Sequence, residues 1–190
     1  MKKIFVLLGF GGFIFSGCNS PKTAPTAPKQ YSATQLYNNE NIDGVAFNKD
    51  ETRVLINSDV TGIQNLYVLT IADTSLQPLT HSTKESFYGL AYLPGTDSYL
   101  YASDQGGNEN DHIYLQTSGN SDPKDLTPWN GSKNSMHDWS SNKQALFIQS
   151  NKRDPKYFDL LKADTSNWNF KLFYQTESFQ IQYEKSFTCP

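Results

Sequence analysis

Residues 42–81 read IDGVAFNKDETRVLINSDVTGIQNLYVLTIADTSLQPLTH. This segment contains four short runs rich in apolar and β-branched residues, at 44–47, 53–58, 65–71 and 76–79, and such runs predict strands. Between the runs lie Asn, Asp, Gly, Ser and Thr, which favour turns. In the third run both alternating sets of side chains are largely apolar, so we expect strands that are buried on both faces.

The same four-strand pattern recurs in two later segments. Four landmarks return at spacings of 44 to 47 residues: Phe47, Tyr92 and Trp139; Ser58, Ser103 and Ser150; Tyr67, Tyr114 and Phe158; and Thr80, Thr127 and Tyr174. A unit of about 45 residues with four strands is typical of a β-propeller blade. A β-sandwich, the other all-β architecture with short strands, does not require such a period.

The repeat therefore predicts an all-β fold, a partial β-propeller of about three four-stranded antiparallel blades. The blades are expected at about 42–81, 87–129 and 135–176 within a domain spanning 34–178. Residues 179–190 are either an incomplete next blade or an aberrant tail. Since propellers typically have four to eight blades, three blades leave two open sheet faces, which further blades or self-association of the chain would cover.

The N-terminus has the pattern of an export signal. Lys2 and Lys3 precede an apolar run at 4–15, which is too short to span a bilayer as a helix. The run ends in Phe-Ser-Gly before Cys18, which resembles the lipobox of bacterial lipoproteins, with Phe where Leu is usual. This predicts a signal peptide at 1–18 with lipidation of Cys18, and an exported chain anchored to the bacterial envelope, at the outer membrane or on the periplasmic side. An uncleaved membrane anchor and an ordinary secretory signal are the alternatives.

A Pro-rich segment at 19–33 follows the cysteine and is expected to be a tether, because nothing apolar in it asks for burial. Docking of this segment on the domain surface is the alternative. The formal net charge of the chain is −3, which excludes the basic face of a nucleic-acid-binding protein. Two cysteines cannot form a disulfide-dense scaffold.

Two loops carry the candidate contact residues: Asp104, Asn108, Glu109 and Asp111 in the first, and Arg153 and Asp154 in the second. The first loop is rich in oxygen ligands for Ca²⁺, but it lacks the EF-hand spacing, and Gly and Asn also suit a tight turn between strands. The second loop either contacts a substrate or another domain, or is a solvated turn in which Asp154 pairs with Arg153 or with Lys152.

Three strings carry a family resemblance, at 79–87, 105–115 and 150–160. Together they resemble the N-terminal propeller of bacterial S9 serine peptidases, the prolyl oligopeptidase family, whose repeats are similar to those of TolB and WD40-like proteins. The resemblance implies a propeller that gates peptide access to a catalytic α/β-hydrolase domain. The alternative is a non-enzymatic, TolB-like lipoprotein that serves as a binding or scaffold module in the envelope.

No catalytic residue is predicted in this chain. The sequence contains no G-x-S-x-G nucleophile motif, so we expect the chain alone to be inactive. Ser135, His137 and Asp138 are close in sequence, but neighbouring strand residues point to opposite faces and do not make a triad. His81 and His112 also lack the spacing and the cysteines of a zinc site, so neither a metal nor a cofactor is expected.

Overall fold

The structure, a computed structural model, describes residues 28–37, 39–119 and 122–177. The chain divides into two compact units, Met1–Asn38 and Asn39–Pro190. Cys18 of the predicted lipobox and the tail at 179–190 lie outside the described residues. Among the helices that are described, none has the length and apolar character needed to cross a membrane.

The described part of the first unit contains one short helix, α1 (Ala33–Tyr37), with no buried residues. Ser32 caps its start, since Ser32 Oγ accepts a hydrogen bond from the Gln35 backbone N at 3.2 Å. The Gln35 side chain accepts one in return from the Ser32 backbone N at 3.0 Å. This reciprocal arrangement is a capping box, and it explains a helix that was not expected in or beside the predicted tether.

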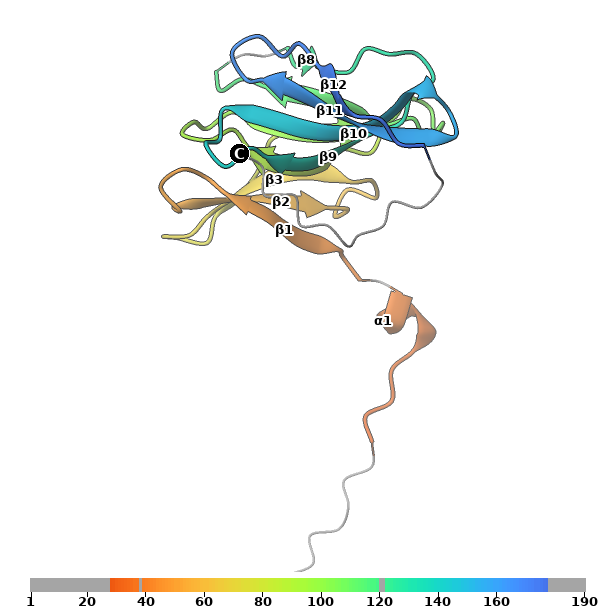
Figure 1. Ribbon diagram of the computed structural model, residues 1–190. Helices are drawn as coiled ribbons and strands as arrows, with labels where there is room; N and C mark the ends of the chain where they lie inside the picture. Colours follow the sequence, from red (N-terminus) through yellow and green to blue (C-terminus); the bar gives the residue numbers. More distant parts are fainter. Residues whose placement is uncertain (1–27, 38, 120–121, 178–190) are drawn as a thin grey trace, which may run out of the picture. The chain divides into compact units, whose positions relative to one another are not determined.

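The second unit contains three four-stranded antiparallel sheets, each with its strands in sequence order (Figure 1). The first sheet consists of β1 (Ile42–Phe47), β2 (Arg53–Ser58), β3 (Asn65–Thr70) and β4 (Leu76–Pro78). The second consists of β5 (Tyr88–Tyr92), β6 (Tyr99–Ser103), β7 (His112–Gln116) and β8 (Lys124–Asp125). The third consists of β9 (Asn134–Trp139), β10 (Ala145–Asp154), β11 (Tyr157–Asp164) and β12 (Lys171–Tyr174). The all-β partial propeller is confirmed, and the β-sandwich alternative is wrong.

Strand register shows which residues of the three sheets are equivalent. The predicted serine landmarks are equivalent in pairing. Ser58 and Ser103 end their strands and lie opposite Asn65 and His112, and Ser150, which lies inside the longer β10, lies opposite Asp159. All three serines are buried. The aromatic landmarks also match, since Phe47, Tyr92 and Trp139 each end a first strand and pair with the residue four before the serine.

The other two landmarks are wrong in the third sheet. Tyr67 and Tyr114 pair with the residue two before the serine, and in the third sheet that pairing belongs to Leu161 rather than Phe158. The spacing itself is regular, because Leu161 lies 11 residues after Ser150 just as Tyr114 lies 11 residues after Ser103, so the sequence alignment placed Phe158 three residues too early. The fourth landmark, Tyr174, is exposed. The threonine that bonds to the third strand is Thr176, whose hydroxyl donates to Phe158 O.

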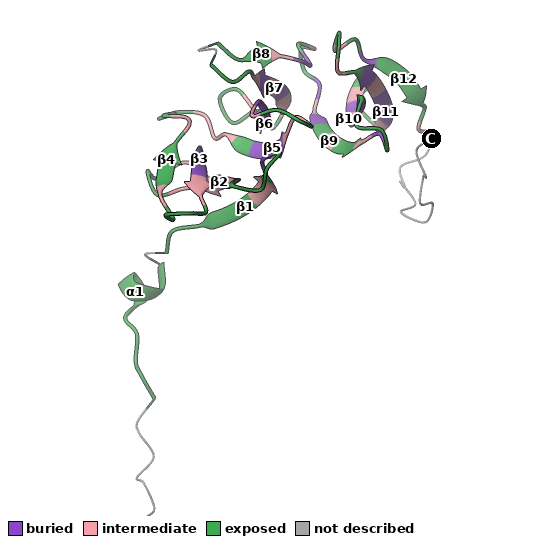
Figure 2. Ribbon diagram, turned by 90° about the vertical axis from the view of Figure 1, so that its left-hand side faces the viewer, coloured by how far each residue is buried: buried purple, intermediate pink, exposed green. Residues whose placement is uncertain are grey.

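Two apolar cores join the sheets. In each sheet, we call the face that carries the residue two before the serine landmark (Ile56, Tyr101 or Ile148) the front, and the opposite face the back. In the second and third sheets the front is the face toward the preceding sheet. The first seam packs Leu55 and Leu66, on the back of the first sheet, against Tyr99 and Tyr101 on the front of the second. The second seam packs the back of the second sheet against the front of the third; its buried members are Leu100, Ile113, Leu115, Leu126, Leu146, Ile148, Leu161, Ala163 and Phe170. Figure 2 shows the resulting pattern, with the middle strands buried and most of β1, β4 and β12 exposed.

Candidate functional site

The first predicted contact loop, residues 104–111, uses its polar groups to hold its own backbone. Asp104 Oδ2 accepts a hydrogen bond from the Glu109 backbone N at 2.9 Å. Gly106 has a φ of +67°, which favours glycine, and its N donates to Glu85 Oε2 at 2.9 Å. These contacts support the interpretation of a tight structural loop.

Asn108 completes the turn, since its Oδ1 accepts a hydrogen bond from the Asn110 backbone N at 2.9 Å. Asp111 is the last residue of the loop; its Oδ2 lies 3.9 Å from Lys133 Nζ, and its side chain is 29% exposed. Partial burial raises the pKa of Asp111, and Lys133 opposes that rise. Within the described residues, no group of three or more His, Cys, Asp or Glu side chains is arranged to hold a metal ion.

Lys133, just before β9, and Asn134, at its start, link the two predicted contact loops through hydrogen bonds. The carbonyl of Asp111 accepts hydrogen bonds from the Asn134 backbone N at 3.0 Å and side-chain Nδ2 at 2.9 Å. On the other side, Asn134 Oδ1 accepts one from Ser150 Oγ at 2.6 Å, and Lys133 N donates to Asn151 Oδ1 at 2.7 Å. The structure therefore brings the loop at 104–111 and the start of the hairpin at 150–159 into one polar network, which the sequence did not indicate.

The second predicted contact loop is the tip of the long β10–β11 hairpin. Arg153 pairs with Asp159 through Nε–Oδ2 at 2.6 Å and Nη2–Oδ1 at 2.9 Å, and Nη2 also donates to Thr176 O at 3.0 Å. The expectation that Arg153 pairs with Asp154 is therefore wrong. Asp154 instead closes the tip, where its Oδ1 accepts the Lys156 backbone N at 2.9 Å.

Asp159 is the residue that sequence reasoning missed. It is 2% exposed, and besides Arg153 it accepts the Thr176 backbone N at 2.9 Å. These hydrogen bonds, led by the one from Arg153, hold the pKa of Asp159 below its ordinary value despite the burial. An acidic residue between apolar neighbours in a predicted strand was the available signal, since such a position must be paired when it is buried.

Lys152 lies beside this pair on the same hairpin. Its Nζ is 3.8 Å from the centre of the Trp129 ring, which is a cation–π contact. Partial burial lowers the pKa of Lys152. Trp129 in turn meets Phe170 edge-on at 5.9 Å, so the contact ties the hairpin to the second seam.

The other residues considered from the sequence lie on β9 and on the β7–β8 pair. Ser135, His137 and Asp138 are exposed on β9, and the Asp138 carboxylate accepts the Trp139 backbone N at 2.6 Å. His112 Nδ1 lies 2.7 Å from Asp125 Oδ2, a contact that joins β7 to β8. Asp138 therefore bonds to its own strand, and His112 supports the pairing of β7 with β8.

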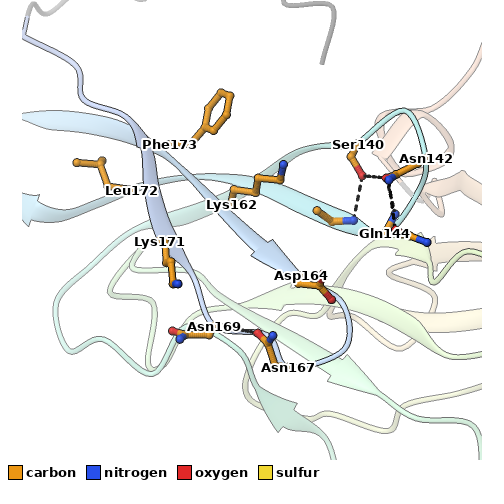
Figure 3. Close-up of a pocket in the computed structure, with 11 residues that line it drawn as sticks. Ser140, Asn142, Gln144, Lys162, Asp164, Asn167, Asn169, Lys171, Leu172 and Phe173 are labelled. Atoms are coloured by element: carbon orange, nitrogen blue, oxygen red, sulfur yellow. Dashed lines mark hydrogen bonds between the residues drawn. The ribbon is translucent and has the colours of Figure 1, made fainter. Parts of the chain in front are cut away.

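A pocket of about 370 Å³ lies on the back of the third sheet (Figure 3). Its lining is mainly polar, with Lys162 and Lys171 beside Asp164, and its apolar part is Leu172 and Phe173. A second pocket, of about 600 Å³, lies on the first sheet. Neither pocket contains the predicted contact residues, so the polar network of the two loops remains the candidate functional site.

This fold and this site define a class: a partial β-propeller in which a polar network joins two loops of neighbouring sheets. Dipeptidyl aminopeptidase BIII of Pseudoxanthomonas mexicana is 25% identical over 170 residues, which cover 83% of this chain and 24% of that protein. No protein-family model matches the chain. The chain thus spans about a quarter of the length of its curated relative.

Solved structures agree on the fold. TolB from Acinetobacter baumannii matches with a TM-score of 0.57 and 16% identity, over 70% of this chain and 32% of that one. A prolyl endopeptidase matches with a TM-score of 0.55 and 12% identity, over 70% of this chain and 21% of that one. The fold expected from the sequence is confirmed: the chain is a partial β-propeller, similar to the propellers of TolB and of a prolyl endopeptidase.

Proposed function

We propose that this chain is the propeller portion of an S9-type serine peptidase, which restricts the access of peptides to a catalytic α/β-hydrolase domain. The observation that carries the proposal is the similarity to a dipeptidyl aminopeptidase over 170 residues, together with the propeller fold. Peptides are the substrates that this role implies. The described residues contribute the wall of the channel and its loops, and the reacting serine belongs to a different domain.

The experiment is an immunoprecipitation from cells that make the chain naturally, with antibodies against residues 31–178. The precipitate is treated with a fluorescent fluorophosphonate, which labels activated serines. We expect a labelled band well above 21.4 kDa. A 21.4 kDa band with no labelled protein in the precipitate would contradict the peptidase role and favour a non-enzymatic, TolB-like function.

We further propose that Cys18 is lipidated and anchors the protein to the bacterial envelope. The basic Lys2 and Lys3, the apolar run and the small residues before the cysteine support this. Attached acyl chains contribute about 0.8 kcal/mol for each buried CH₂, so several chains hold a protein on a membrane. The test is metabolic labelling with an alkyne fatty acid: wild type should be labelled and sediment with membranes, and Cys18→Ser should do neither. Equal labelling of both would refute the anchor.

A further inference from the structure

A pocket of about 350 Å³ lies in the first seam, between the back of the first sheet and the front of the second. Val68 and Leu79 line it from the first sheet, and Tyr99 and Gln116 line it from the second. Both walls belong to this chain, so the pocket does not depend on what covers the outer faces of the first and third sheets. Its volume is within the range of small-molecule sites.

The second seam shows what fills the same space one sheet further on. Strand pairing gives each of the four lining residues a counterpart there: Leu115 for Val68, Leu126 for Leu79, Leu146 for Tyr99, and Ala163 for Gln116. These counterparts are buried core residues, and Phe170 and Trp168 pack with them. Both aromatic residues come from the turn between β11 and β12. In the second seam, the chain therefore fills this space with its own rings.

The corresponding turn of the second sheet, at 117–123, contains no aromatic residue. The two turns have the same length, since Lys124 follows Gln116 by eight residues and Lys171 follows Ala163 by eight. Strand pairing makes the two lysines equivalent, so Pro123 stands where the third sheet has Phe170. Phe170 is buried, whereas Pro123 is exposed. The pocket of the first seam thus corresponds to the space that an aromatic side chain occupies in the second.

Two polar features of the pocket narrow the chemistry of its occupant. Its charged lining residues, Arg53 and Asp97, pair with each other at 2.9 Å, so the lining carries no net charge. Tyr99 is 7% exposed, and within the described residues its hydroxyl makes no hydrogen bond. Burial raises the pKa of Tyr99 to about 12, so the hydroxyl stays protonated and can donate as well as accept. A neutral ring with a hydrogen-bonding group would give this hydroxyl a partner.

We propose that this pocket binds a neutral aromatic ring that carries a hydrogen-bonding group, as an indole or a phenol does. The ring packs on Val68 and Leu79, as Phe170 packs in the second seam, and its polar group bonds to the Tyr99 hydroxyl. Such a ring belongs either to a free small molecule or to an aromatic residue of a peptide. The site needs only the two sheets of the first seam, so it is independent of the peptidase role.

The test is an NMR titration of the full chain, labelled with ¹³C-tyrosine, with indole. The ring signals of Tyr92 and Tyr99, each assigned by its loss in the matching Phe variant, should shift and saturate with a dissociation constant of roughly 0.1–1 mM. Tyr99→Phe should raise that constant roughly three- to tenfold, as read from Tyr92. Tyr101→Phe is the matched control, because Tyr101 belongs to the same core but does not line the pocket, and it should bind as wild type does.

Pro123→Phe places a ring of the chain itself at the position of Phe170. This variant should bind indole at least roughly tenfold more weakly, and its midpoint in urea unfolding should not fall below that of wild type. N-acetyltryptophanamide separates the two sources of the ring: competition with indole indicates a peptide residue, and binding of indole alone indicates a free small molecule.

The absence of a saturable shift at Tyr92 and Tyr99 in wild type overturns the proposal. A dissociation constant equal to that of wild type in Tyr99→Phe, or in a stably folded Pro123→Phe, also overturns it, because indole would then bind elsewhere on the chain. If Pro123→Phe lowers the urea midpoint, Tyr99→Phe alone decides.

Discussion

The first seam predicts that Gly89→Ala destabilises the fold although it adds only one methyl group. That group would lie 2.9 Å from Leu55 Cδ2 and 3.1 Å from Asn57 Oδ1. Leu55 is fully buried, so it has no solvent-filled space to move into. The methyl group also displaces the amide that accepts the Gly89 backbone N–H at 2.8 Å. Both effects act across the seam and leave the strands themselves unchanged.

The expected cost follows from three contributions. Overpacking of a filled core costs about 1–3 kcal/mol. A weakened hydrogen bond adds about 0.5–1.5 kcal/mol. Replacing glycine by alanine returns about 0.4–1 kcal/mol, because it reduces the freedom of the unfolded chain. The free energy of unfolding should therefore fall by roughly 1–3 kcal/mol.

The assay is urea unfolding followed by tryptophan fluorescence, at a protein concentration where each variant sediments as a monomer. Gly44→Ala is the control at the equivalent position, where the new contacts of 3.8 Å and 4.0 Å predict no loss of stability. Leu55→Val should partly relieve Gly89→Ala in a double-mutant cycle, since it removes atoms from the crowded space. Equal stability of Gly89→Ala and Gly44→Ala would refute the seam argument.

Three further predictions concern buried groups. Arg153 lowers the pKa of Asp159 below its ordinary value of 3.8. The pair therefore stabilises the protein above that pH, and this effect is lost as the pH falls below it. In Asp159→Asn, the free energy of unfolding measured against pH should fall less steeply in the acid range. Ser150→Ala removes a partner at 2.6 Å from Asn134 Oδ1 and should cost about 1–3 kcal/mol in urea unfolding, and an unchanged midpoint would contradict this. Leu100→Ala, at a fully buried position of the second seam, should cost about 2–5 kcal/mol, whereas a cost near that of an exposed site would mean a loosely packed core.

The repeat could be predicted from the sequence because its signals are local. Alternating apolar runs and the turn residues between them fix each hairpin, and equal spacing places Phe47, Tyr92 and Trp139 at the same position of three sheets. The prediction failed where it matched an aromatic residue to aromatic residues instead of keeping the spacing. Phe158 resembles Tyr67 and Tyr114 in its side chain, but strand register places Leu161 opposite Ile148, in the position that the two tyrosines occupy.

The candidate site could be found only in part. The sequence identified both contact loops, because acidic, amide and glycine residues gather in them. It gave Arg153 the wrong partner, since the carboxylate that binds it is six residues away across a hairpin whose length was unknown. The linker through Lys133 and Asn134 carried no signal at all, because its hydrogen bonds depend on how neighbouring sheets meet.

The sequence by itself thus determined the class of fold, the number of sheets and the aromatic residue that ends the first strand of each sheet, because these follow from short-range periodicity. The tertiary structure alone decided which glycine is buried and which is open. Gly44 and Gly89 occupy equivalent places in their strands, yet only Gly89 faces a neighbouring sheet in the described residues. That difference arises from packing between sheets, which depends on residues far apart in the chain and leaves no trace in the local pattern.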